Sequence, residues 1–361
     1  MTQRERQIMQ LIESDPMISQ QDLADKLGIA RSSVAVHISN LMKKGYIAGK
    51  GYVLRTGTYA TVVGGVNIDI GGQSFAPLVD RDSNPGKVTM SLGGVGRNIA
   101  HNMSLLGLEV RMLTAMGDDI HAQQVAASCS ELGIDITHAL QVPGGATSTY
   151  LYLADPGGDM ALAVSDMEIC KAITPQYLAA NLNILNNSQV VVVDTNIPQR
   201  SLEYLAANCT APIFCDPVSQ PKAEKIRSIL GKLHTLKPNR LEAELLSGVP
   251  IRTVEDAQRA ARVLIDTGMH RVFISLGSDG VLAADREQMI HLPCCPAQVV
   301  NATGAGDAFM AGLVWAYLTG TDLKGSAKAG LASAAVALEG RETINPNLSV
   351  PAIRAKMAES K

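Results

Sequence analysis

From residue 59 onward, short apolar segments alternate with longer stretches of helical periodicity. The apolar segments are ATVVGGVNIDI, EVRMLTA, QVVVVDTN, APIFCDPV, LHTLKPN and RVFISLG. Such alternation is typical of a mostly parallel sheet with helices on its faces, so we predict an α/β fold. Ligands bind such sheets at the carboxyl ends of the strands, where Asn67 and Asp69 follow the first segment.

Two regions break the alternation, residues 70–92 and residues 147–166. In the second region, STYLYLAD and MALAVSDM flank PGGD, a pattern that predicts a hairpin. We expect the two regions to form a small β-lid over the crevice.

Composition limits the classes of protein that need to be considered. The 361 residues, 46% hydrophobic and 18% charged, indicate an ordered chain with room for two domains. The six cysteines show no C-x-x-C spacing, so we expect reduced thiols rather than a metal site. Neither an export segment nor a membrane-spanning apolar run is evident, so we expect a cytoplasmic protein without membrane attachment.

The N-terminal segment differs from the rest in charge. Residues 1–55 contain eight Lys/Arg and five Asp/Glu, whereas the remainder contains 23 and 29. Apolar spacing predicts helices near residues 3–12 and 20–27 and across RSSVAVHISNLMKKGYI, and IAGKGYVL is typical of a hairpin. We therefore predict a separate domain over residues 1–55 and a larger one over residues 59–361, joined by RTGTY.

Three helices and a hairpin in this order resemble the winged helix-turn-helix domains of bacterial regulators. The resemblance implies that the third helix enters the major groove of DNA. The residues expected to contact DNA are Arg31, Ser32, Ser33, His37, Lys43, Lys44 and Lys50. A protein-docking or dimerisation module is the alternative.

Three motifs in the larger domain are candidates for chemistry. In GGVGRN, Gly93 and Gly94 would let a sugar approach the backbone and Asn98 could bind its hydroxyls, although helix–strand packing explains the same glycines. In NRLE, Asn239 and Glu242 share one helix face and suit a hydrated Mg²⁺, or equally a helix cap.

The third motif, VNATGAGDAFMAGL, places two glycines and an alanine before an acid and an apolar helix. A helix N-terminus carries about half a positive charge and unpaired N–H groups, so an anion is favoured at Gly304, Ala305 and Gly306. Asp307 could then take a proton beside a bound phosphate. Its alternative role is that of an N-cap.

Together and in this order, these motifs resemble the ribokinase-like, or PfkB, family of carbohydrate and nucleoside kinases, from about Tyr59 to the C-terminus. The resemblance implies a three-layer α/β/α domain with a β-lid, and binding of ATP with Mg²⁺. Within the family, DSNPGKV, TSTYL, DPVS, HTLKPNRLEAELLSG and NPNLS look most like pseudouridine kinases.

The resemblance also implies roles for individual residues. Asp307 is the base, and Gly304 to Gly306 form the anion hole. The ribose side is implied to hold Asn67, Asp69, Gly93, Gly94 and Asn98, with Asn84, Thr149 and Tyr150 as candidates for the base of the nucleoside. The nucleotide side is implied to hold Asn239, Glu242, Ser275, Gly277 and Gly280, with Glu242 meeting Mg²⁺ through water.

One position departs from the family pattern. Many relatives carry an acid where this chain has Asn301, in a region that helps several of them bind a monovalent cation, so cation use stays open. The expected function is ATP-dependent 5′-phosphorylation of pseudouridine by a homodimer that also binds DNA. The alternatives are a kinase of another ribonucleoside or sugar, and a transcription regulator whose kinase-like domain senses a ligand.

Overall fold

The computed structural model describes residues 2–15, 18–47 and 58–359. Its N-terminal part contains the three predicted helices, α1 (Gln3–Ser14), α2 (Gln20–Leu27) and α3 (Arg31–Lys43). They bury one small apolar core, which includes Ile8, Ile12, Leu23, Val34, Ile38 and Leu41. The predicted hairpin lies outside the described residues, apart from Ile47.

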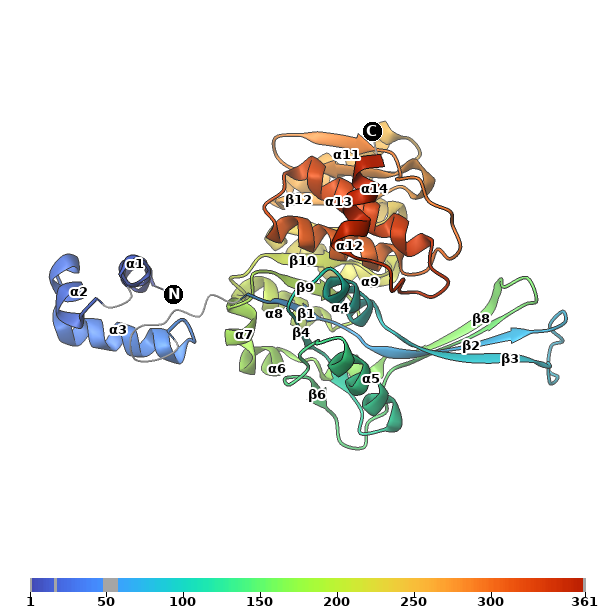
Figure 1. The fold of residues 1–361 in the computed structure, drawn as a ribbon, viewed down its shortest axis with the longest axis horizontal. Helices are drawn as coiled ribbons and strands as arrows, with labels where there is room; N and C mark the ends of the chain where they lie inside the picture. The colour runs from blue at the N-terminus through green and yellow to red at the C-terminus, as the bar shows by residue number, and fades with distance from the viewer. Residues whose placement is uncertain (1, 16–17, 48–57, 360–361) are drawn as a thin grey trace.

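The larger part of the chain is built on an eight-stranded sheet, as the alternation predicts (Figure 1). Its strand order is β14-β13-β12-β11-β10-β9-β1-β4. Six strands are parallel, namely β1 (Ala60–Val63), β4 (Val110–Leu113), β9 (Val191–Asp194), β10 (Ile213–Asp216), β11 (Thr235–Leu236) and β12 (Arg271–Ser275). Two antiparallel strands that the sequence reading did not predict extend one edge, β13 (Val281–Ala284) and β14 (Met289–Leu292).

Helices cover both faces of this sheet and give the predicted three layers. One face packs against α4 (Val95–Leu105), α5 (Ile120–Glu131), α12 (Ala305–Leu318), α13 (Leu323–Leu338) and α14 (Val350–Glu359). The other packs against α6 (Pro175–Ala180), α7 (Leu182–Asn186), α8 (Gln199–Asn208), α9 (Gln220–Ala223), η2 (Glu224–Lys232), α10 (Arg240–Ser247) and α11 (Val254–Asp266). The short elements β5 (Ala115–Met116), β6 (Leu140–Gln141), η1 (Glu168–Ala172) and η3 (Gly277–Asp279) complete the fold.

The predicted lid is a second sheet of four strands that extends away from the α/β body (Figure 1). Its order is β3-β2-β7-β8, formed by β2 (Asn67–Ser74), β3 (Gly86–Gly93), β7 (Thr149–Ala154) and β8 (Met160–Asp166). The apolar run that starts at Ala60 is thus divided, because the chain leaves the main sheet after Val63 and enters the lid at Asn67. Asn67 and Asp69 therefore lie where the lid joins the carboxyl ends of the parallel strands.

Candidate active site

Asp307 lies in the first turn of α12, and it is not the N-cap. The cap position is Gly304, whose φ of 84° is left-handed and whose added Cβ would lie 2.1 Å from the Thr343 carbonyl oxygen. Only glycine fits there. The start of α12 has no side-chain cap, so its backbone N–H groups are open to a ligand. The capping alternative for Asp307 is wrong.

The Asp307 carboxylate accepts a hydrogen bond from one side chain and is affected by the charges of others. Asn98, on α4, donates its Nδ2–H to Asp307 Oδ2 over 3.0 Å. Burial and the negative charge of Asp216 raise the pKa of Asp307 to about 7, although the Asn98 hydrogen bond and the Lys237 charge act in the opposite direction. A carboxylate with such a pKa can exchange a proton near neutral pH.

Lys237 is a site residue that the sequence reading missed. Its ammonium forms an ion pair with Asp216 over 3.0 Å, and both side chains are more than nine-tenths buried. Burial opposes its charge, but Asp216 overcomes that effect and raises the Lys237 pKa. A Cβ on Gly306 would lie 3.2 Å from Lys237 Nζ, so the positive charge stands directly beside the glycine-rich start of α12. The available signal was a lysine after a buried strand.

Asp69 and the GGVGRN loop meet at the lid end of the crevice. Position 67 pairs with position 93 and position 69 with position 91 across β2 and β3. A Cβ on Gly93 would lie 2.2 Å from Asp69 Oδ2, so this glycine makes room for the carboxylate. Burial raises the pKa of Asp69, while a hydrogen bond from Asn67 lowers it. The glycine at position 94 serves packing, since its Cβ would lie 2.6 Å from the Gly65 carbonyl oxygen.

A second missed residue, Asp194, ties this loop to the first strand. Its Oδ2 accepts hydrogen bonds from the backbone N–H groups of Gly65, at 2.9 Å, and Gly96, at 2.8 Å. Its Oδ1 accepts from the Asn196 N–H over 2.8 Å. Asp194 is fully buried at the end of β9, and burial raises its pKa against these hydrogen bonds. The fourth valine of QVVVVDTN directly precedes this acid, which was the available signal.

Asn98 contributes more than its contact with Asp307. Its Oδ1 is buried and, within the described part of the chain, accepts no hydrogen bond. A buried acceptor without a donor is costly, so a bound hydroxyl that donates to it would be stabilised. The structure thus connects the sugar-side loop to the acid at α12 through one amide.

Asn239 and Glu242 form a complete capping box at the start of α10. Asn239 Oδ1 accepts from the Glu242 N–H over 2.9 Å, and Glu242 Oε2 accepts from the Asn239 N–H over 2.8 Å. Burial raises the Glu242 pKa. The capping alternative is therefore correct for this pair, and a role toward Mg²⁺ stays a prediction. Among the described residues no group of three or more His, Cys, Asp or Glu forms a metal site.

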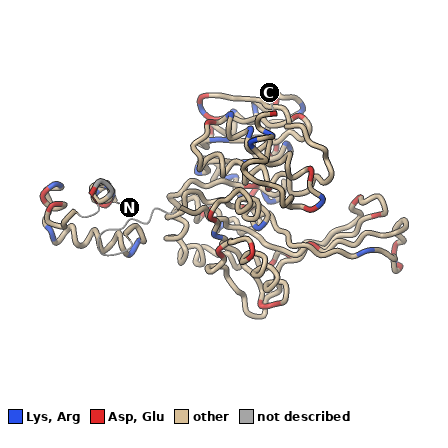
Figure 2. Tube along the Cα trace, viewed as in Figure 1, with Lys and Arg blue, Asp and Glu red and all other residues tan. Residues whose placement is uncertain are grey.

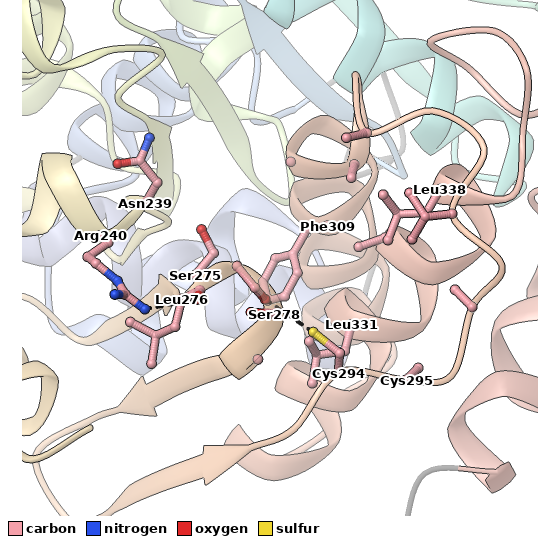
Figure 3. Close-up of a pocket in the computed structure, with 18 of the residues that line it drawn as sticks. Asn239, Arg240, Ser275, Leu276, Ser278, Cys294, Cys295, Phe309, Leu331 and Leu338 are labelled. Carbon is pink, nitrogen blue, oxygen red and sulfur yellow. Dashed lines mark hydrogen bonds between the residues drawn. The ribbon is translucent and has the colours of Figure 1, made fainter. Parts of the chain in front are cut away.

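A cavity of about 830 Å³ lies between α10, β12 and α12 (Figure 3). Asn239, Ser275, Gly277 and Gly280 line it, together with Lys237 and the residues of the α12 start. Phe309, Leu331 and Leu338 form an apolar wall opposite Ser275 (Figure 3). Such a cavity has space and apolar surface for a planar base at one end and anion-binding groups at the other.

The three candidates for contacts to the base of the nucleoside lie in different surroundings. Asn84 uses its amide within the loop between β2 and β3, accepting from the Val79 N–H at 2.7 Å and donating to the Val79 and Asp82 carbonyls at 3.0 Å. The structure does not bring Asn84 to the crevice of its own chain. Thr149 and Tyr150 pair with the Ile68 and Asp69 positions of β2, and so they lie at the site.

Asn301, the position that departs from the family pattern, is tied to local backbone. Its Nδ2 donates to the Arg341 carbonyl over 3.2 Å, and its Oδ1 accepts from the Thr303 N–H over 2.9 Å. These contacts fix the loop before Gly304. They do not decide whether a monovalent cation binds.

The residues predicted to contact DNA are mostly accessible on α3. Arg31, Ser32, Ser33 and Lys43 are exposed and His37 is partly exposed, on the side of α3 away from the small core. Lys44 differs because its ammonium binds the buried Glu5 carboxylate at 2.8 Å. Lys50 lies outside the described residues. Residues 1–47 hold six Lys/Arg and five Asp/Glu, and charges of both signs are visible on the helices (Figure 2).

Comparison with known proteins defines the class. Residues 58–350 match the pfkB family carbohydrate kinases, so the chain belongs to this family and is a sugar or nucleoside kinase. Residues 1–48 match the winged helix-turn-helix DNA-binding family. A solved carbohydrate kinase from Agrobacterium tumefaciens superimposes with a TM-score of 0.74 at 26% identity, covering 84% of this chain and 98% of that one. Both predicted families and the ribokinase-like fold are confirmed.

Individual relatives share most of the sequence. A pseudouridine kinase of Escherichia coli is 40% identical over 300 residues, which are 82% of this chain and 96% of that relative. An uncharacterized sugar kinase of the same organism is 37% identical over 97% of both chains. A ribokinase of Arabidopsis thaliana, solved with ribose and ATP, has a TM-score of 0.74 at 21% identity, covering 83% of this chain and 98% of that one, which supports the fold alone. No helix in the described part of the chain is long and apolar enough to cross a membrane.

Proposed function

We propose that the protein transfers the γ-phosphoryl group of ATP to the 5′-hydroxyl of pseudouridine. The observation that carries the reaction is Asp307, with a pKa near 7, at the uncapped start of α12 and within reach of Asn98 and Lys237. The similarity to a pseudouridine kinase over most of the chain supports the substrate. The reaction needs one proton acceptor and stabilisation of negative charge, and both lie here.

In this proposal Asp307 accepts the proton of the 5′-hydroxyl as its oxygen attacks. The backbone N–H groups of Gly304, Ala305 and Gly306 bind the transferring phosphoryl group, and Lys237 adds positive charge beside them. Fixed donors of this kind stabilise the charge that develops in the transition state. Asn67, Asp69, Gly93, Gly94 and Asn98 would hold the ribose, and Thr149 and Tyr150 would lie beside it.

The large cavity would hold ATP. Ser275, Gly277 and Gly280 line it on the side of β12, Asn239 lines it at the start of α10, and Glu242 is the capping partner of Asn239. Glu242 uses only Oε2 in its capping bond, so its other oxygen could hold a hydrated Mg²⁺ through water. The Mg²⁺ would neutralise phosphate charge. We leave the use of a monovalent cation open.

The test is an assay of the purified protein with Mg²⁺-ATP and pseudouridine, with the product identified by mass and phosphorus NMR. The expected product is the 5′-monophosphate. A panel of uridine, inosine, guanosine, ribose and deoxyribose tests the second candidate, a kinase of another nucleoside or sugar. The 30% identity to a guanosine-inosine kinase of Exiguobacterium acetylicum favours including the purine nucleosides.

We further propose that the N-terminal domain, predicted to span residues 1–55, binds DNA through α3. Ligand binding to the kinase domain would regulate this DNA binding. The exposed Arg31, Ser32 and Ser33 at the start of α3 support this proposal. The alternative of a ligand sensor without turnover is disfavoured, because Asp307 and its partners are intact.

We also propose a homodimer. One face of the lid carries Ile70, Met90, Leu151 and Val164 in one row and Val88, Leu153 and Leu162 in the next. Six of these seven are exposed, Val88 at 70% and Leu162 at 63%. Light scattering of the protein and of Leu162→Asp tests whether this face joins two copies.

A further inference from the structure

A second cavity, of about 650 Å³, lies at the carboxyl ends of β9 and β10. Its lining includes Ser165 from the lid, Asn196 after β9, and the cationic residues Lys171, Arg200, Lys222 and Lys225, of which Lys171 forms an ion pair with Glu168. The Asn196 N–H donates a hydrogen bond to Asp194 Oδ1, and Asp194 Oδ2 accepts one from Gly96 in the GGVGRN loop. Asp194 therefore links a lining residue of this cavity to the loop on the sugar side of the crevice.

Two of the cationic groups, those of Lys222 and Lys225, donate hydrogen bonds to neutral oxygens. Lys222 Nζ donates to Asn196 Oδ1 over 2.6 Å, and the Asn196 side chain also hydrogen-bonds the Asp194 carboxylate, which orients its amide. Lys225 Nζ donates to the Thr195 carbonyl at 2.8 Å and the Ile197 carbonyl at 3.2 Å. An ammonium group has three N–H donors, so Lys222 keeps donors for a ligand.

Strand register places this cavity relative to the sugar site. Asp69 pairs with Tyr150 across β2 and β7, and Tyr150 pairs with Ser165 across β7 and β8, so the three side chains share one face of the lid. Two strand spacings separate Asp69 from Ser165, which is about 10 Å. That separation is comparable with the length of a nucleoside. A nucleoside whose 5′-hydroxyl meets Asp307 and whose ribose meets Asp69 would direct its base toward this cavity.

We propose that this cavity holds the base and selects a pyrimidine-2,4-dione, with Lys222 donating to a ring carbonyl and Asn196 positioning Lys222. The inference rests on the proposed nucleoside kinase function. An ammonium can only donate hydrogen bonds, and a dione presents two carbonyl acceptors. Both uridine and pseudouridine carry a carbonyl at the ring position opposite the glycosidic bond, where cytidine carries an amino group, so a Lys222 that meets this position would set donor against donor with cytidine.

The matched variants are Lys222→Met, which keeps the length and loses the donors, and Lys232→Met, which removes an exposed lysine of η2 outside this cavity. Calorimetry measures binding of pseudouridine, uridine, cytidine and ADP to each protein. We expect Lys222→Met to weaken pseudouridine and uridine about 10- to 100-fold, the effect of losing a charged hydrogen bond, and to leave ADP unchanged. Ser165→Ala, a smaller change at the lid, should weaken the same two ligands several-fold.

The outcomes separate this inference from the proposed reaction. If Lys222→Met and Lys232→Met bind pseudouridine equally well and both keep their turnover, the cavity assignment is overturned and the proposed reaction stands. If Lys222→Met loses binding of both pseudouridine and uridine, but the unaltered protein does not phosphorylate pseudouridine, the cavity assignment stands and the proposed reaction is overturned. Equal binding of cytidine and uridine by the unaltered protein contradicts the selection. If ADP binding falls in parallel in Lys222→Met, the lysine supports the fold rather than the base, and the assignment is also overturned.

Discussion

The two ends of the crevice differ in how their polar groups are satisfied. At the α12 end, Asp307 is bonded to Asn98, and Lys237 is paired with Asp216, so each of these charged side chains already has a partner in the protein. At the lid end, Asp69 has only the short contact from Asn67, and Lys222 has only the Asn196 amide among the hydrogen bonds described above. The first end is organised before a ligand arrives, and the second offers groups that a ligand completes.

This difference indicates a division of labour. Preorganised charges stabilise a transition state because they need no rearrangement at the moment of reaction. Groups that the substrate itself completes contribute to binding and discrimination. Changes at the α12 end should therefore lower kcat, whereas changes at the lid end should raise KM for the substrate. The predictions below test that contrast, beginning with the largest effect.

Asp307→Asn should lower kcat at least about 100-fold while substrate binding changes little, because an amide keeps the shape but cannot accept the proton. Steady-state kinetics and calorimetry measure the two effects. Near-normal turnover would contradict the base assignment.

Unfolding of the same variant provides its control. The pKa of Asp307 rises from 3.8 to about 7 on folding, so the folded protein binds more protons than the unfolded chain between these values, and this group destabilises the fold as pH rises through that window. The free energy of unfolding of Asp307→Asn, minus that of the unaltered protein, should accordingly be larger at pH 8 than at pH 4. A loss of activity together with a lower melting temperature at pH 8 would indicate a folding defect instead.

Asp69→Ala should weaken nucleoside binding about 10- to 100-fold and leave ATP binding nearly unchanged, because the carboxylate would accept hydrogen bonds from the nucleoside and not from ATP. Titration of each ligand into the variant measures this split. Equal loss of both ligands would remove the contrast between the two ends of the crevice.

The pH profile should report the balance of charges around Asp307. Since the base must be ionised, kcat/KM should fall tenfold per pH unit below about pH 7. Asp216→Asn removes a negative charge that raises this pKa and frees the Lys237 charge to lower it, so the acidic limb should move to lower pH. An unmoved limb in this variant would assign the titration to another group.

Sequence alone predicted the elements whose information is local. The GAGD and GGVGRN motifs, the lid and the parallel sheet each depend on a continuous segment or on a regular alternation. Among the missed residues, Asp194 ends β9, Lys237 follows β11 and Lys222 lies in the short helix α9, so their roles arise only when strand order brings these elements together. Asn84 is the opposite case, because its motif is local but the lid strands carry it away from the crevice of its own chain, so its contact with the base stays a prediction.

The smallest expected effect on catalysis comes from removing residues 1–55. All the catalytic candidates lie beyond Tyr59, and the small core of α1 to α3 is separate from the two cores of the sheet, so the remaining chain should keep its kcat within about twofold.

DNA binding should be lost on the same deletion, and in the intact protein it should fall steeply with salt as phosphate counterions are released. Changing Arg31, Ser33 or His37 should relax sequence preference, whereas changing Lys43 should weaken binding to all sequences alike. Because Lys44 already binds Glu5, its loss should lower the stability of the three helices as well. If the intact protein shows no salt-sensitive binding to a genomic DNA library, with or without pseudouridine, the N-terminal helices serve protein docking, and the contrast between the two ends of the crevice stands without them.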